Sequence, residues 1–391
     1  MREVVIIDIV RTAIGKYGGA VAGLSGKELG AAAISGLLKR TGFDAGKLDH
    51  VVLGCVLQNG PNAYVARTAA LTAGIPYTVP ALTVNRLCGS ALEAINQAAR
   101  LIQCGEADAC VAGGVEQMSG APYLVPTARW GARMGDASMV DSMVSVLTDP
   151  IHNYHMGITA ENVAKKHSIS REEQDEYALR SQKLTAAAAE KGYFDSQIVP
   201  VEIASKKEKI VFNKDEGIRK DITIEDLKKL RPAFEKDGTV TAGNSSTIND
   251  AASVALLMEK DAAKALGLVP MCKIVSWAVD GLDPAYMGLG PALAVPKALS
   301  KAKLSLNDID VHELNEAFAA QALGVLRELK LDCDRVNPNG GAISLGHPIG
   351  ATGAILMGKA ANELIRAKKE FGMVSMCIGG GQGIAAVIQR V

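Results

Sequence analysis

The chain contains 391 residues, with 42 Lys and Arg against 42 Asp and Glu, and 48% of its residues are hydrophobic. This length exceeds the roughly 250–300 residues at which a single core stops growing, so more than one packed unit is expected. The balanced charge argues against a general nucleic-acid binder, and the apolar content excludes a disordered chain.

Cysteine usage and apolar run lengths indicate the compartment. The seven cysteines form no C-x-x-C pair, and their odd number and scattered spacing argue against a disulfide framework and a structural zinc site. The apolar run at 4–10 is too short for a secretory signal, and nothing approaches the roughly 18 apolar residues of a membrane span. We expect a cytoplasmic protein with reduced thiols and with no metal, membrane or nucleic-acid partner.

The first third of the chain alternates short apolar runs with amphipathic stretches. Buried strands are predicted at 4–10, 50–57, 81–88 and 107–114, and helices at about 29–37 and 90–105. This alternation indicates an α/β layer architecture.

The last 120 residues repeat this order. Strands are predicted at 272–281, 308–314, 371–378 and 384–391, and helices at 291–302, 316–329 and 355–369. Segments 109–119 and 376–386 are also similar, which suggests two related halves.

The composition changes between these halves. Residues 161–240 contain 32 charged residues in 80, 16 of each sign, which predicts an exposed insertion with at least one helix over 171–192. Within it, 206–231 carries nine Lys and Arg against six Asp and Glu, for which a solvated face is the ordinary explanation.

Cys88 lies where a predicted strand gives way to a helix, in VNRLCGSALEA. Unpaired N–H groups and the positive end of a helix dipole stabilise a thiolate, so this position favours a nucleophile. Gly89 removes a side chain beside the sulfur and would leave room for a substrate carbonyl. A buried structural cysteine explains the same spacing, and both interpretations stay open.

His347 lies in the glycine-rich stretch NPNGGAISLGHPIGATG. Pro348 biases His347 toward an extended backbone. The helix that follows keeps the imidazole neutral, which is the form that a general base needs. A loop histidine satisfied by hydrogen bonds is the alternative.

Cys377 ends a predicted strand and precedes the turn GGGQG. This turn lacks G-x-G-x-x-G spacing and leads into a strand, so hydride transfer to a dinucleotide is disfavoured. It is either a tight hairpin only, or its backbone N–H groups form an oxyanion hole beside a thiol.

Three further positions have ordinary explanations when taken alone. Asn315 and Glu316, in HELNEAFAAQ, suit a helix N-cap followed by a first-turn acid. His155, in NYHMGITAENVA, suits loop packing. The histidines show no metal-ligand spacing.

Taken together, these motifs resemble the thiolase family. NRLCGSA, NEAFAAQ, GGAISLGHPIGATG and CIGGGQG occur in that order, and VRTAIGKYGGA near the start is similar as well. The resemblance implies an α/β fold with two βαβαβαββ halves stacked as a five-layer αβαβα sandwich. It implies an N-terminal half over 1–118, a loop domain over 119–250 that returns into that half, and a C-terminal half over 251–391.

The same resemblance implies reactions of acyl-coenzyme A thioesters, with no metal or bound cofactor. Cys88 would take the acyl group, His347 would accept its proton, and Cys377 would exchange a proton with the α-carbon of a second acyl-CoA. Asn315 would hold a water that forms one oxyanion hole with His347. The backbone N–H groups of Cys88 and Gly379 would form the other.

The loop domain of thiolases binds coenzyme A. The matching substrate-binding positions here are Leu147, His155, Met156, Arg219, Phe234, Ala242, Ser246, Met287 and Phe318. The positive excess at 206–231 would suit the 3′-phosphate of coenzyme A. Two departures, Asp226 in place of a frequent Ser and NSSTIND at 244–250, put details of nucleotide affinity in doubt.

The resemblance is closest to the short-chain branch, which reversibly condenses two acetyl-CoA to acetoacetyl-CoA by a ping-pong acyl-cysteine mechanism. Met156, Met287 and Phe318 would narrow the acyl pocket to that size. The alternative within the family is a degradative 3-ketoacyl-CoA thiolase of broader chain length. Segment 123–136 is similar to a tetramerisation loop, so a homotetramer is expected, with a dimer as the alternative.

Two other classes of function stay open. A β-ketoacyl synthase relative would use a malonyl unit, although Cys377 stands where that family has a second histidine. A non-enzymatic coenzyme A-binding or redox-sensing protein would pair Cys88 and Cys377 in a reversible disulfide.

Overall fold

The computed structural model describes residues 2–204 and 209–391. Residues 206–208 of the positively charged run therefore lie outside the described residues. Within the described ranges, no helix combines the length and the apolar character that crossing a bilayer requires.

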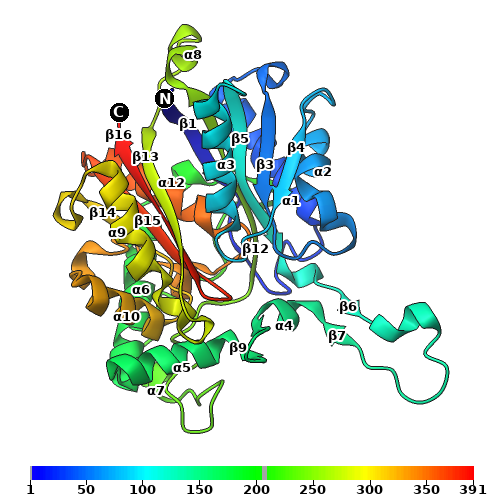
Figure 1. Ribbon diagram of the computed structural model, residues 1–391, viewed down its shortest axis with the longest axis vertical. Helices are drawn as coiled ribbons and strands as arrows, with labels where there is room; N and C mark the ends of the chain where they lie inside the picture. The colour runs from blue at the N-terminus through cyan, green and yellow to red at the C-terminus, as the bar shows by residue number, and fades with distance from the viewer. Residues whose placement is uncertain (1, 205–208) are drawn as a thin grey trace.

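A ten-stranded mixed sheet forms the centre of the protein (Figure 1). Its strand order is β14-β15-β16-β13-β1-β12-β5-β3-β4, and β2 pairs with β12. The strands are β1 (Val4–Arg11), β2 (Gly15–Lys16), β3 (His50–Gly54), β4 (Ala81–Val84), β5 (Ala109–Gln117), β12 (Asn249–Glu259), β13 (Cys272–Gly281), β14 (Val311–Leu314), β15 (Phe371–Ile378) and β16 (Gln382–Arg390).

The sheet consists of two related halves joined at one short contact. In the first, β3 runs parallel to β5, and β12 pairs antiparallel with both β5 and β1. In the second, β14 runs parallel to β15, and β16 pairs antiparallel with both β15 and β13. Only two residue pairs, Val5 with Lys273 and Ile6 with Cys272, connect β1 to β13. The matching orders and directions confirm the predicted duplication.

Helices form three layers around the two half-sheets. The helices are α1 (Gly26–Thr41), α2 (Val65–Thr72), α3 (Ser90–Cys104), α4 (Ser142–Val146), α5 (Met156–His167), α6 (Arg171–Glu190), α7 (Ile224–Lys228), α8 (Lys260–Ala265), α9 (Gly290–Ala302), α10 (Ala319–Leu329), α11 (Ala342–Leu345) and α12 (Thr352–Arg366). Apolar residues of α1 and α2 cover the outer face of the first half, and those of α9 cover the outer face of the second. Helices α3 and α12 share one core with strands of both halves, which makes them the middle layer of an αβαβα sandwich.

Small residues bring the two helices of the middle layer together. A Cβ atom on Gly353 of α12 would lie 2.5 Å from the backbone nitrogen of Leu92 in α3, so only glycine allows this approach. In the first half α3 precedes β5, and in the second half α12 precedes β15. Cys88 and His347 each lie a few residues before one of these helices, so they occupy equivalent places in the two halves.

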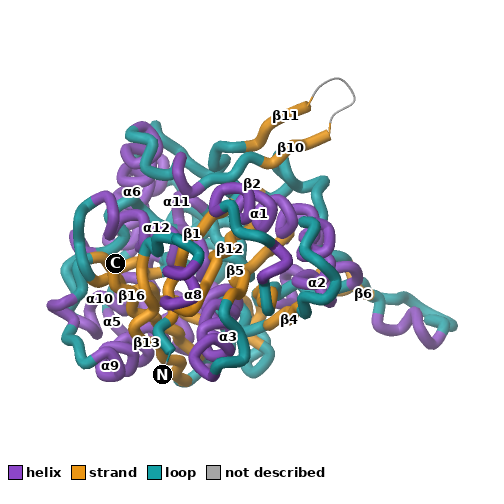
Figure 2. Tube along the Cα trace, turned by 90° about the horizontal axis from the view of Figure 1, so that it is seen from above, coloured by secondary structure: helices purple, strands orange, loops and turns teal. Residues whose placement is uncertain are grey.

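The inserted segment lies against one end of the sandwich. It contains α4 to α7 and the short strands β6 (Tyr123–Leu124), β7 (Val140–Asp141), β8 (Thr148–Asp149), β9 (Tyr154–His155), β10 (Val201–Ala204) and β11 (Lys209–Phe212). The β6–β7 arm and the β10–β11 hairpin project from the body (Figure 2). Helix α6 confirms the helix predicted over 171–192.

Some predicted elements differ in extent from the observed ones. The strands predicted to end at residues 57 and 88 end at Gly54 and Val84, which leaves Cys55 and Cys88 in loops. The helix predicted from residue 316 begins at Ala319. The residue-250 boundary falls inside β12, which lies in the first half-sheet. The division into domains itself stays a prediction.

Candidate active site

A cavity of about 500 Å³ opens where loops from both halves and the insertion meet. Most of the predicted site residues line it, namely Leu147, His155, Met156, Phe234, Ala242, Ser246, Met287, Phe318, Cys88, His347, Cys377 and Gly379. Asn315 lies behind His347, and Arg219 is not among the lining residues.

A tight turn presents Cys88 at the start of α3. Leu87 adopts a left-handed backbone with φ of 44°, an unusual conformation for a residue with a side chain. The turn is held by Ser90, whose hydroxyl accepts from the backbone N–H of Arg86 at 2.9 Å and donates to the carbonyl of Leu87 at 2.6 Å. The Cys88 sulfur is thereby fixed relative to the helix.

Burial, rather than the helix dipole, dominates the ionisation of Cys88. Burial raises the pKa of Cys88 to about 11, although the backbone N–H groups of Gly379 and of Cys88 itself point at the sulfur and oppose the rise. The N–H groups expected to stabilise the Cys88 thiolate do lower its pKa, but burial outweighs them and the net shift is upward. The role expected of Gly89 is wrong, because a Cβ there would lie 2.7 Å from Ile378 Cδ1; glycine permits core packing at this position.

His347 occupies the loop between α11 and α12, where close contacts with Asn249 fix its backbone. Its backbone N–H donates to Asn249 Oδ1 at 3.0 Å. The preceding Gly346 has a φ of 109°, and a Cβ there would lie 2.4 Å from Asn249. Burial lowers the pKa of His347 to about 4, so the imidazole is neutral at pH 7 as predicted.

Asn315 follows β14 and is fully buried. Its Nδ2 lies 3.4 Å from His347 Nε2, and its Oδ1 has no hydrogen-bond partner among the described residues. The N-cap interpretation is wrong, since Phe318 caps α10. Glu316 is likewise no first-turn acid, because its buried carboxylate accepts from Ser181 Oγ at 2.6 Å and Asn337 Nδ2 at 2.8 Å.

Cys377 lies at the end of β15 and is fully buried. Cys377 lines the same cavity as Cys88, and burial together with the nearby Cys88 raises the pKa of the Cys377 thiol. Both are free thiols. Gly380 and Gly381 adopt φ values of 77° and 81° in the β15–β16 turn, which is therefore a tight hairpin that also directs the Gly379 N–H toward Cys88.

The sequence comparisons agree with this arrangement. The family model of the thiolase N-terminal domain matches residues 4–261, and that of the thiolase C-terminal domain matches residues 268–390. The chain belongs to the thiolase family. It is 52% identical to beta-ketothiolase BktB of Cupriavidus necator over 392 residues, covering 100% of both chains.

Solved structures of other thiolases superpose on the whole chain. The acetyl-CoA acetyltransferase of Bacillus anthracis is 48% identical with a TM-score of 0.98, covering 100% of this chain and 99% of that one. The human mitochondrial 3-ketoacyl-CoA thiolase is 44% identical with a TM-score of 0.97, again covering 100% and 99%. The five-layer thiolase fold expected from the sequence is thus confirmed.

Aromatic rings form one wall of the thiolase cavity. The His155 ring stacks on Phe234 with centroids 4.7 Å apart, and Phe318 meets Phe234 edge-on at 6.0 Å. His155 Nδ1 accepts from the backbone N–H of Gly157 at 3.0 Å, so its proton is on Nε2. Burial lowers the pKa of His155, which therefore remains a neutral hydrogen-bond donor.

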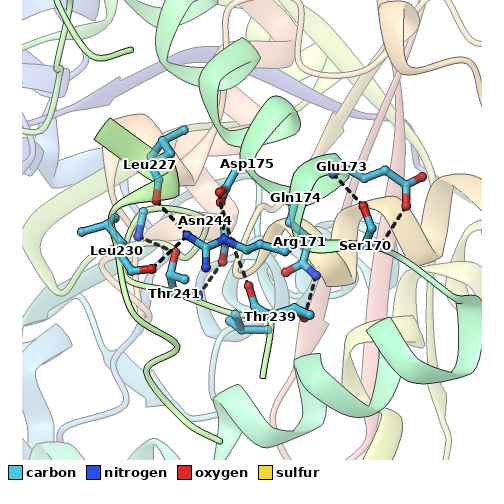
Figure 3. A network of polar contacts seen from close by, with 12 residues as sticks. Ser170, Arg171, Glu173, Gln174, Asp175, Leu227, Leu230, Thr239, Thr241 and Asn244 are labelled. Atoms are coloured by element: carbon cyan, nitrogen blue, oxygen red, sulfur yellow. Dashed lines mark hydrogen bonds and ion pairs between the residues drawn. The ribbon is translucent and has the colours of Figure 1, made fainter. Parts of the chain in front are cut away.

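A buried polar network fixes the segment that carries this wall (Figure 3). Asp175 of α6 accepts from Arg171 Nε at 2.8 Å and from Asn244 Nδ2 at 2.9 Å. Arg171 also donates to the carbonyls of Leu227 and Leu230. The chain from Leu227 to Asn244, which contains Phe234 and Ala242, is thereby attached to α6.

Two positions singled out for nucleotide binding lie at the surface. Arg219 is exposed, and its backbone N–H donates to Gln182 Oε1 at 3.2 Å. Asp226 belongs to a capping box with Thr223 at the start of α7, and its carboxylate also pairs with Lys229 at 3.3 Å.

Sequence reasoning missed several lining residues. Lys16, Tyr17, Met118 and Ile349 also line the cavity. The first two fall in VRTAIGKYGGA, whose resemblance to the family was the available signal.

Within the described residues, no group of three His, Cys, Asp or Glu side chains is placed to hold a metal ion.

Proposed function

We propose that this thiolase reversibly condenses two acetyl-CoA molecules to acetoacetyl-CoA and free coenzyme A. One observation carries the proposal: two thiols and a neutral imidazole, from separate halves, line a single cavity. Thioester substrates suit this set, because an acyl-enzyme divides one difficult condensation into two easier steps.

In the first step, the Cys88 sulfur attacks the thioester carbonyl of acetyl-CoA while its proton passes to His347 Nε2. The carbon–sulfur bond to coenzyme A then breaks, and the Cys377 thiol protonates the leaving thiolate, so Cys377 becomes a thiolate while His347 keeps the proton from Cys88. The Cys88 and Gly379 N–H groups, already directed at the sulfur, support the oxyanion of this step.

In the second step, Cys377 removes a proton from the methyl group of another acetyl-CoA. The resulting carbanion attacks the acetyl group on Cys88, so a carbon–carbon bond forms and the bond to Cys88 breaks. The enolate oxygen would be stabilised by His347 with a water held by Asn315, whose unpaired Oδ1 supports that role. The Cys88 thiolate takes its proton back from His347, and thiolysis is the reverse sequence.

The outer cavity suits coenzyme A. His155 offers an Nε2–H donor for the pantetheine amide, and Phe234, Ala242 and Ser246 supply its wall. Lys16 lines the cavity and would supply a positive charge for a phosphate group of coenzyme A. Arg219 is exposed outside the lining, so it could contact a phosphate only at the protein surface. Met156, Met287 and Phe318 surround the inner end, which favours acetyl and acetoacetyl groups over longer chains.

The assembly and compartment are also part of the proposal. Trp130, Met134 and Met139 on the β6–β7 arm are 82%, 98% and 67% exposed, which supports burial of this arm in a homotetramer. We place the enzyme in the cytoplasm.

The deciding experiment compares thiolysis of acetoacetyl-CoA with that of a longer 3-ketoacyl-CoA. A kcat/KM that favours acetoacetyl-CoA supports the short-chain assignment, and the opposite ranking supports a degradative thiolase. Mass spectrometry of the enzyme mixed with acetyl-CoA should find an acetyl group on Cys88, and Cys88→Ser should abolish it. Cys377→Ala should still acetylate but fail to condense; condensation at the wild-type rate would refute its assignment as base.

A further inference from the structure

Glu116 is a buried carboxylate that no step above uses. It lies near the end of β5 with 0% of its surface exposed. Its oxygens accept from the backbone N–H groups of Val56 at 2.9 Å and Leu57 at 3.1 Å, and Cys55 Sγ lies 3.5 Å away. The carboxylate therefore holds the loop that follows β3 in the first half.

The same carboxylate also contacts the loop of the second half that carries His347. The backbone N–H of Gly350, three residues after His347, is close enough to the carboxylate to lower its pKa. A Cβ on Gly350 would lie 2.5 Å from Glu116 Oε2, so the contact depends on glycine there. Glu116 thus connects loops that come from different halves.

Both loops pack against the nucleophile. Val56 and Leu57 from one loop and Ile349 from the other form an apolar cluster, and Cys88 packs on it. Burial raises the pKa of Glu116 itself to about 7, and in its charged form Glu116 disfavours the Cys88 thiolate. A change in either loop would therefore alter the surroundings of Cys88 as well as the position of His347.

We propose that Glu116 is a positioning residue for the acylation step, because it sets the His347 loop relative to Cys88 across the junction of the two halves. The inference rests on the proposed function. Glu116 does not line the cavity; it acts through its hydrogen bonds to Val56 and Leu57 and its close contact with Gly350.

A neutral isostere tests this role. In Glu116→Gln the amide replaces one acceptor oxygen with a donor, so at least one loop N–H faces another N–H group and that loop must shift. Glu116→Asp keeps the charge but is one methylene shorter, so it should restore part of the function.

Glu161 provides a matched control. It is 1% exposed, and it likewise accepts from two successive backbone N–H groups, those of Thr239 and Val240 at 2.8 Å, but in the segment that carries the coenzyme A wall. Glu161→Gln should therefore raise the KM for acetyl-CoA. Glu116→Gln should instead lower the acylation rate constant.

The experiment measures acetyl-enzyme formation from acetyl-CoA in a single turnover, together with KM and thermal stability. We expect Glu116→Gln to slow acylation by about tenfold or more, with KM within about twofold of wild type. Partial recovery in Glu116→Asp supports the proposal.

Two outcomes would overturn it: acylation at the wild-type rate in Glu116→Gln, or the same KM-dominated loss as in Glu161→Gln. If Glu116→Gln fails to fold, the Glu116→Asp acylation rate decides, and a wild-type value refutes the proposal. A wild-type enzyme that forms no acetyl-enzyme would instead refute the proposed function.

Discussion

Thr352 Oγ1 lies 2.7 Å from His347 Nδ1 and 3.0 Å from the carbonyl oxygen of Pro348. The hydroxyl donates to that carbonyl, so it accepts from Nδ1–H, and the imidazole proton is on Nδ1. Nε2 is then unprotonated on the side of Asn315. This tautomer is the one that can take a proton from Cys88.

Replacing Thr352 should therefore impair both half-reactions. Thr352→Val keeps the shape but loses the acceptor for Nδ1–H, so the imidazole can adopt the other tautomer. We expect about a tenfold fall in kcat for acylation and for condensation, with little change in KM. Thr352→Ser retains the hydroxyl and should stay near wild type; an equal loss in both variants would contradict the tautomer argument.

Alkylation of Cys88 should depend on His347. Burial favours the neutral thiol and the neutral imidazole, so the free enzyme has little thiolate at pH 7 unless His347 receives the proton. In His347→Ala, the rate of iodoacetamide reaction at Cys88 at pH 7 should fall by about tenfold or more. The exposed Cys104 serves as an internal control whose rate should not change. Peptide mass spectrometry measures both, and an unchanged Cys88 rate would remove His347 as its base.

The network in Figure 3 should control affinity more than chemistry. Asp175→Asn leaves Arg171 without its carboxylate and loosens Asn244, so the segment with Phe234 moves. We expect the KM for acetyl-CoA to rise by about threefold to tenfold, with a smaller effect on acylation kcat. Asp226→Asn, which affects only the exposed capping box with Thr223 and the pair with Lys229, is the control. Loss confined to kcat would show that the segment does not bind coenzyme A.

His312 should make the fold sensitive to acid. Burial, with a smaller effect of Arg335, lowers its pKa to about 4 from an unfolded value near 6.5. Above pH 6.5 neither state binds the proton; as the pH falls from 6.5 to 4 only the unfolded chain does, so stability is lost by up to about 3 kcal/mol. Urea unfolding of His312→Gln should decline less over this window, and curves parallel to wild type would contradict the assignment.

The strands and helices that the sequence analysis names were predictable because most of these strands contain an apolar run and each of these helices has an apolar face. The predictions were weakest for residues whose burial and hydrogen-bond partners depend on tertiary contacts. Strand β12 (Asn249–Glu259) was not predicted, although AASVALLM within it is an apolar run; its side chains are buried in the cores on both faces of the sheet. Glu316 was interpreted as a first-turn acid because the local sequence does not show its four hydrogen-bond partners, which come from distant parts of the chain.

The catalytic residues of the candidate site could be predicted because four short motifs contain them. The pKa values of these residues could not be predicted from the motifs. A helix start predicts a lower pKa for Cys88, whereas burial against Val56, Leu57 and Ile349 depends on how the halves pack. Arg219 shows the same limit: its charge suggested a phosphate contact, yet its place in the fold is outside the cavity lining. Charge along the chain does not determine the direction in which a side chain points.

The close approach of Gly353 to Leu92 has a bearing on attempts to engineer this enzyme. The gap between α3 and α12 sets the spacing of Cys88 from His347, and neither Leu92 nor Gly353 lines the cavity. Mutant libraries restricted to cavity-lining positions would therefore omit positions whose substitution strongly changes the catalytic rate. A single methyl group added at Gly353 would change the positions of Cys88 and His347 only by shifting the backbone of the two helices.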